Sequence, residues 1–309
     1  GLNDLLAGYF LGSLVQQEEN LLQAGMGLLV YNLLAFGGQY PVALWMEKVK
    51  NPKQFLTASY MLNVAAVALF AFLPQLSIVL MGAASAIYHV AGGSVCARDN
   101  KAVNIGLFAA PGVAGLIAGG YFAWQGYQLL AFLLPAALLF MGLLLLFQIP
   151  GADAEKKTAK QPVSWIPDRH DMIMILLLTV ITLRSAVWNI FQLIHENNYE
   201  WLLVIAGAAF AGKIIGGWLA DRIGWKLYIF ISLFTAMPLV SFFRDELIPF
   251  CIGIGLLQSG IPATTALLIQ SVNGKTERGI GLSFGTAIIA GGLAFSVPAD
   301  FYARSGIIP

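Results

Sequence analysis

Long apolar runs, separated by short polar segments, occupy most of the chain. Most runs are close to the roughly 20 residues that an α-helix needs to cross the hydrocarbon core of a bilayer. The pattern therefore predicts an all-α polytopic membrane protein with about 11 transmembrane helices. The predicted spans lie near residues 2–17, 21–45, 54–73, 75–97, 102–123, 127–149, 171–194, 200–220, 226–243, 246–271 and 278–299.

The longest polar interruption between spans is the segment 151–170, which is rich in Lys, Pro and acidic residues. It separates six predicted spans from five, and such a segment is typical of a cytoplasmic linker between two helical bundles. We therefore expect an N-terminal six-helix bundle over 1–150, the linker over 151–170 and a C-terminal bundle of about five helices over 171–309. The odd number of spans indicates a twelve-helix architecture that lacks its last helix.

Composition and charge support this interpretation. Charged residues make up 11% of the chain and hydrophobic residues 58%, whereas about a quarter of the residues in soluble domains are charged. Most of the 17 Lys and Arg residues lie in alternate loops, near 48–53, 98–101, 156–169, 222–226 and 275–278. Because cytoplasmic loops carry the excess of cations, this distribution places the N-terminus and the linker in the cytoplasm. We expect a multi-pass protein of the inner (plasma) membrane, and the net charge of +1 suggests no nucleic-acid partner.

A charged motif follows the eighth predicted span, where Gly217, Asp221, Arg222 and Gly224 precede further basic residues. It resembles the cytoplasmic loop signature of the major facilitator superfamily, Gly-x-x-x-Asp-Arg-x-Gly. An Asp can cap a helix start or pair with a basic neighbour, and a glycine permits a tight turn. The resemblance implies that this loop latches adjacent helices together in one conformational state.

A degenerate copy of the motif follows the second predicted span, with Glu47 at the acidic position and Ala43 in place of the first glycine. The two copies lie six spans apart, as the internal pseudo-repeat of the superfamily requires. The resemblance therefore implies the two-bundle fold of major facilitator transporters, with Glu47 as part of a second gating loop.

Two shorter motifs resemble the fosmidomycin-resistance branch of bacterial efflux proteins. A Leu-Asn-Asp sequence ending at Asp4 begins the first predicted span, and a Tyr-His pair ending at His89 lies late in the fourth. That branch has Leu-Asn-Asp and Phe-His-Pro-Glu at matching places. A Val-Ala pair replaces Pro-Glu here, so the acidic residue of the second motif is absent. A loose glycine-proline antiporter motif over 106–115 also favours export.

The resemblance implies a secondary active transporter that works by alternating access, with two bundles around a site near the membrane midplane. We expect proton-coupled export (antiport) of a small organic or amphiphilic anion, by a monomer and without a cofactor. Two alternatives remain open: a membrane sensor or receptor with a transporter-like fold, and a lipid flippase without proton coupling. An enzyme is disfavoured, because the chain lacks a complete Gly-x-x-x-x-Gly-Lys-Ser/Thr motif, a nucleophile elbow and metal-ligand spacing among its 3 histidines.

Ionisable residues within a span are costly unless they face protein or water, so they are candidates for function. Arg184 lies in the middle of the seventh span, and Lys213 lies in the eighth. These spans border the central cavity in the superfamily, so we predict that both residues bind an anionic group of the substrate. The alternatives are structural ion pairing or carbonyl capping for Arg184, and snorkelling to the interface for Lys213. Other residues predicted to contribute to substrate binding are Trp188, Asn189, Gln192, Asn32 and Gln258.

Two titratable residues of the first bundle are predicted to carry the coupled proton. A buried carboxyl group such as that of Asp4 can hold a proton, and a histidine such as His89 changes its charge near neutral pH. The alternatives are that Asp4 lies in water near the cytoplasmic end or pairs with a lysine. The alternative for His89 is a packing role, with its ring hydrogen-bonded to a neighbour.

Overall fold

The computed structural model describes residues 1–17, 21–127, 169–194 and 199–292, with a few positions between 133 and 144. Every regular element in these residues is helical, which confirms the predicted fold class. Within them, 6 helices are long and apolar enough to cross a membrane, in agreement with a multi-pass membrane protein. The predicted span 127–149 and the linker 151–170 lie largely outside the described residues, as does the last part of the span 278–299.

In the first half of the chain, the described residues form four long helices and one helix that is interrupted by a π-helical turn, η1. Local sequence explains how some of them begin and end. Asn51 accepts a hydrogen bond from the backbone N–H of Gln54, and Pro52 occupies the first turn, where its missing N–H costs nothing. The elements are α1 (Leu2–Gln17), α2 (Leu21–Asn32), η1 (Leu33–Gly37), α3 (Gln39–Val49), α4 (Pro52–Leu69), α5 (Pro74–Ala97) and α6 (Ala102–Trp124).

Two predicted spans of the second half are interrupted. The span 246–271 divides at Gly260, because Pro262 lacks the N–H that would continue the helix and fits only in a new first turn. The span that starts near 278 contains a second π-helical turn, η2. The elements are α8 (Arg169–Ile194), α9 (Tyr199–Ile223), α10 (Trp225–Phe242), α11 (Leu247–Ser259), α12 (Ile261–Ser271), α13 (Thr276–Ile280), η2 (Gly281–Thr286) and α14 (Ala287–Gly292).

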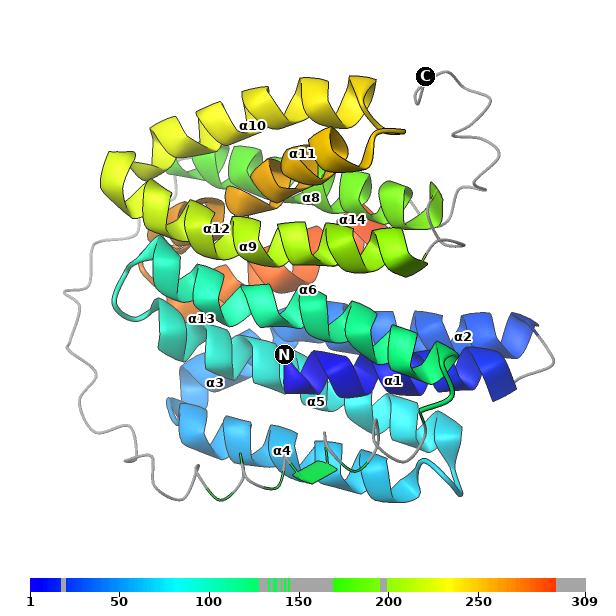
Figure 1. The fold of residues 1–309 in the computed structure, drawn as a ribbon. Coiled ribbons are helices and arrows are strands. Elements are labelled where there is room, and N and C mark those ends of the chain that lie inside the picture. The colour runs from blue at the N-terminus through cyan, green and yellow to red at the C-terminus, as the bar shows by residue number, and fades with distance from the viewer. Residues whose placement is uncertain are drawn as a thin grey trace.

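The two halves lie side by side, with their helices running roughly along one direction (Figure 1). They touch along two seams. In one seam α6 packs between α1 of its own half and α9 of the other, and in the second seam η1 and α3 pack against η2 and α13. The two π-helical turns therefore meet across the halves. Such turns are rare and occur mainly at functional sites.

Small residues set the distance between helices in both seams. A side chain at Gly217 would overlap the backbone of α6, and one at Gly285 would overlap Gln39 and Phe36. Within the halves, the Gly115 and Gly119 pair faces α1 in the same way. Close backbone contact through small residues is how helices associate in lipid, so these glycines serve to pack the helices.

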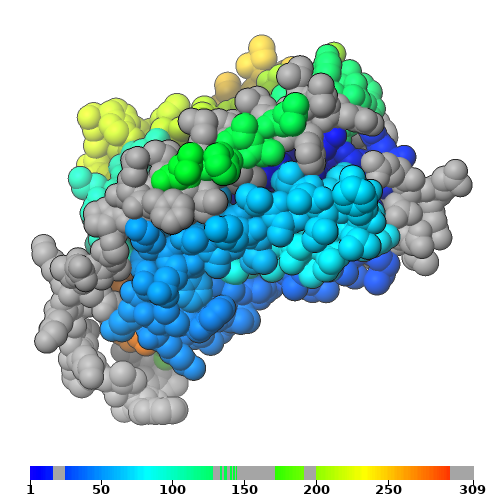
Figure 2. Space-filling model, turned by 90° about the horizontal axis from the view of Figure 1, so that it is seen from below, coloured from blue at the N-terminus to red at the C-terminus, as the bar shows by residue number. Residues whose placement is uncertain are grey.

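Large apolar side chains remain exposed on the outside of the molecule. The face in Figure 2 is formed along much of its length by α4 and α5, which pack against each other. Met61 of α4, Leu76 of α5 and Phe72 between these helices are exposed, and Phe72 is 80% exposed. Apolar surface on this scale is unfavourable in water, so it is the surface that lipid chains cover.

Candidate functional site

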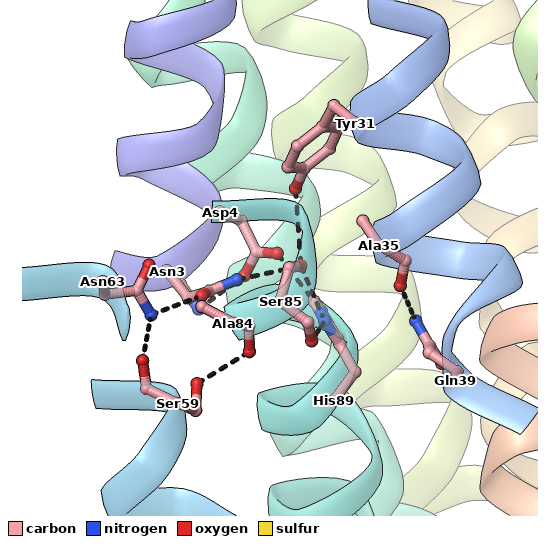
Figure 3. A network of polar contacts seen from close by, with 11 residues as sticks. Asn3, Asp4, Tyr31, Ala35, Gln39, Ser59, Asn63, Ala84, Ser85 and His89 are labelled. Atoms are coloured by element: carbon pink, nitrogen blue, oxygen red, sulfur yellow. Dashed lines mark hydrogen bonds and ion pairs between the residues drawn. The ribbon is translucent and has the colours of Figure 1, made fainter. Parts of the chain in front are cut away.

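The two short motifs of the first half meet in space, because Asp4 of α1 faces His89 of α5 (Figure 3). Nε2 of His89 lies 3.2 Å from Oδ1 of Asp4. Asp4 is 7% exposed, and Gly112 of α6 leaves room for its carboxylate. Asp4 is therefore buried and contacts a histidine. Neither of its two alternatives, exposure to water or pairing with a lysine, describes its surroundings.

A network of buried amide and hydroxyl groups surrounds this pair and joins α1, α2, α4 and α5 (Figure 3). Asn3 donates from Nδ2 to Oγ of Ser85 over 3.1 Å, and the Tyr31 hydroxyl donates to the same oxygen over 3.4 Å. Asn63 donates to Oδ1 of Asn3 over 3.0 Å. Nδ1 of His89 lies 2.8 Å from the carbonyl oxygen of Ser85. Buried polar groups are stable only when hydrogen-bonded, and here they hold one another in place.

Lys213 lies near the middle of α9, on the seam with α6. It is 8% exposed, and its backbone carbonyl faces Gly106 of α6. Among the described residues its ammonium has neither a hydrogen bond nor an ion pair, although Asp4 influences it electrostatically. The segment from Gly207 to Lys213 reads Gly-x-x-x-x-Gly-Lys, but it is continuous helix followed by Ile214 and forms no phosphate loop.

Arg184 of α8 is 1% exposed and lies against the break between α11 and α12. Its Nη1 donates to the Leu257 carbonyl over 3.1 Å, and its Nη2 lies 3.5 Å from Oγ of Ser232. A side chain at Gly260 would overlap the guanidinium. The carbonyl end of a helix carries partial negative charge, so this contact is the carbonyl capping that the sequence left open. Anion binding by Arg184 stays a prediction.

The other predicted binding residues differ in their surroundings. Trp188 packs against an apolar cluster of the second half that includes Phe250. Asn189 and Gln258 are buried, whereas Asn32 is exposed. The side chain of Gln192 lies outside the described part of the structure. Their predicted roles in substrate binding remain predictions.

The gating-loop motif holds the two halves together. Both carboxylate oxygens of Asp221, at the end of α9, accept hydrogen bonds of 2.9 Å from the backbone N–H groups of Ala102 and Val103. These groups begin α6, whose N-terminus carries partial positive charge. Trp225 also donates to Asp221, over 2.8 Å. Asp221 therefore caps a helix of the opposite half.

Other residues of the motif shape this capping loop. Gly224 starts α10 with a φ of 96°, a conformation that strains any other residue. Gly217 permits the close approach of α9 to α6 that brings Asp221 to its partners. Arg222 stacks on the Trp218 ring, with its Cζ 3.7 Å from the ring centroid, so it makes a cation–π contact.

The degenerate copy of the motif makes the reciprocal connection. Glu47, near the end of α3, accepts two hydrogen bonds of 2.9 Å from Arg278 and one of 3.3 Å from Lys275. The basic residues belong to the second half. We call the Asp221 and Glu47 contacts the two latches, and the end of the bundle where they lie the latch end. Each half thus supplies one acid to hold the other half closed.

Several residues that build these sites were not identified from the sequence. Tyr31, Ser85 and Asn63 carry the polar network, and Arg278 and Lys275 complete the second latch. Polar side chains inside apolar spans were the available signal for the network. The latch partners carried no such signal, since basic residues are expected in these loops in any case.

Two helical halves, joined along two seams and latched at one end, form the fold of major facilitator superfamily transporters. No protein-family model and no curated protein sequence matches the chain.

Solved structures of this fold match nearly the whole chain. The transporter FucP, crystallised in the outward conformation, matches with a TM-score of 0.72 and 15% identity over 99% of this chain and 92% of that one. The E. coli fucose:proton symporter FucP, in a variant form, gives 0.69 and 16% identity over the same shares of both chains. A bacterial homologue of the iron transporter ferroportin, in an outward-facing state, gives 0.53 and 13% identity over 96% of this chain and 91% of that one.

Proposed function

We propose that this chain is a secondary active transporter of the major facilitator superfamily that couples protons to the movement of a small organic or amphiphilic anion. One juxtaposition supports this most strongly. A buried acid–histidine pair lies in one half, and a buried lysine without a partner among the described residues lies at the seam of the other. The pair is suited to hold a proton, and the lysine is suited to bind an anion.

The two sites are suited to different ligands. A carboxylate next to an imidazole can gain or lose a proton with little rearrangement. A lysine ammonium buried without a counter-charge is unfavourable, and an anionic ligand is the species that relieves this cost.

The latches suit an alternating-access cycle. Both exist only when the halves are close at the latch end, so in this conformation the two halves are held together at that end. With the orientation predicted from the loop charges, the latch end is cytoplasmic and the structure is the outward state. Export of the anion in exchange for protons stays the predicted direction.

The test is transport by the purified protein in proteoliposomes with an imposed pH gradient. A panel of labelled monocarboxylates, phosphonates and acyl amphiphiles supplies the probes, and a trapped pH dye follows proton movement. We expect one class of anion to move with the gradient, and Lys213→Gln to abolish that flux while Lys213→Arg retains part of it.

Three results would contradict the proposal. Flux that ignores both the gradient and Lys213→Gln would exclude proton-coupled anion transport. Saturable binding of a probe without flux would indicate a receptor. Movement of fluorescent phospholipid between leaflets, insensitive to pH, would indicate a flippase.

A further inference from the structure

The contacts of the His89 ring identify which of its nitrogens carries a hydrogen. Nδ1 lies 2.8 Å from the main-chain carbonyl oxygen of Ser85 and 3.2 Å from its hydroxyl oxygen. A carbonyl oxygen only accepts hydrogen bonds. A bare ring nitrogen at 2.8 Å from it would place two lone pairs against each other. Nδ1 therefore carries a hydrogen and donates it to the Ser85 carbonyl.

The other nitrogen faces the carboxylate. Nε2 lies 3.2 Å from Oδ1 of Asp4. If Nδ1 carries the only ring hydrogen and Asp4 is ionised, this second contact would again join two acceptors. The contact is favourable only with one hydrogen between the two atoms, on Nε2 or on the carboxyl oxygen. Both placements leave the pair with no net charge.

We infer that Asp4 and His89 share one exchangeable proton, and that Ser85 is a positioning residue which keeps the second ring hydrogen on Nδ1. Other ionisable groups also face the pair or influence it. The Tyr88 ring lies edge-on to the imidazole, and Lys213 acts electrostatically across the seam. A neutral pair suits such a buried place better than an isolated charge.

The hydrogens at Nδ1 and Nε2 of His89 have different roles, because their partners lie on different helices. Ser85 and His89 are four residues apart on α5, so their contact lies within one helical turn. Asp4 belongs to α1. A shift of α1 relative to α5 would break the contact at Nε2 and leave the one at Nδ1 intact. The hydrogen at Nε2 is therefore the one exchanged in a transport cycle, and only this last step rests on the proposed function.

Nitrogen NMR of the histidine ring tests the assignment without measuring transport. Replacing His170 and His195 with Gln leaves His89 as the only labelled histidine in the full chain, purified in detergent. We expect a hydrogen on Nδ1 in this protein. When Asp4→Asn is added to this single-histidine protein, we expect a neutral ring with its hydrogen on Nδ1. The bare Nε2 then accepts a hydrogen bond from the Asn amide.

Ser85→Ala is the matched control, because it removes the hydroxyl and keeps the carbonyl. We expect the same hydrogen on Nδ1 there. A bare Nδ1 in the single-histidine protein would overturn the inference, even if the variants at Asp4 and Ser85 did not fold. A move of the hydrogen to Nε2 in Ser85→Ala would also overturn it, because the hydroxyl would then set the ring. The expected NMR result without any anion flux would contradict the proposed function alone.

Discussion

The polar interiors of the two halves are built in opposite ways. In the first half Asp4 and His89 lie within a network in which neighbouring side chains supply the partners. In the second half Arg184 has its Nε without a partner among the described residues, and Lys213 has none at all there. Among the described residues, the network of the first half leaves Oδ1 of Asn63 without a partner, but its buried acid faces a histidine. The two buried cations of the second half face no acid there. The contrast is therefore between ionisable groups that face each other and cations that face none.

The contrast predicts opposite effects on stability. Asp4→Ala leaves His89 and the network around it without a partner, and removing one member of a buried pair costs about 3–5 kcal/mol. Thermal unfolding in detergent should therefore occur at a clearly lower temperature. Gln16→Ala, at an exposed position of the same helix, is the control. An unchanged melting temperature for Asp4→Ala would show that the pair contributes little.

Lys213→Met should change the melting temperature in the opposite direction in the same assay. It removes an unpaired buried charge and keeps the apolar length of the side chain, so we expect a higher melting temperature. Anion affinity should fall by about 10- to 100-fold, the usual value of a hydrogen bond to a charged group. Substrate counterflow measures the affinity. A less stable protein with unchanged affinity would remove Lys213 from the binding site.

A smaller effect is expected at the helix break. In Gly260→Ala the new methyl group would overlap the guanidinium of Arg184. Overpacking of this kind costs about 1–3 kcal/mol. The second change Arg184→Met should restore much of the loss, because it removes the group that is displaced. A double-mutant cycle on melting temperature measures this coupling, and additive effects would mean that the two residues do not interact.

The smallest effects are expected at the latches. Glu47→Gln weakens the contact with Arg278 at a partly exposed place, where an ion pair contributes about 0.2–1 kcal/mol. The change should open the latch end more often, as measured by distances between spin labels on α3 and α13. Arg244→Gln is the control, since its partner Asp245 is its chain neighbour in an exposed loop. Equal distance distributions for both variants would argue against a latch.

The sequence was sufficient for the helical fold because the bilayer imposes a simple rule on apolar length. Because ionisable groups are costly within a span, it also gave Asp4, His89 and Lys213 as candidates, whose roles stay predictions. Their arrangement required the structure. The contact between α1 and α5 depends on how separate helices pack, and no local pattern in the chain records it.

Other features could not be predicted from the sequence, for a different reason. The π-helical turns η1 and η2 have apolar sequences like those around them, so hydrophobicity does not distinguish them from α-helix. Arg184 gave the same sequence signal as Lys213, although one caps a helix and the other has no partner among the described residues. Both read as cations within a span, and only their neighbours in the fold distinguish them.

The unpartnered lysine also has an electrical consequence. The charge of Lys213 lies near the middle of a helix long enough to cross the membrane, so it lies within the transmembrane voltage. A unit charge moved through the full field of 100 mV gains or loses about 2.3 kcal/mol. If the chain works as proposed, the anion-free protein would take this charge with it as the halves move, whereas the anion-bound protein would not. Membrane voltage should therefore act mainly on the step without anion.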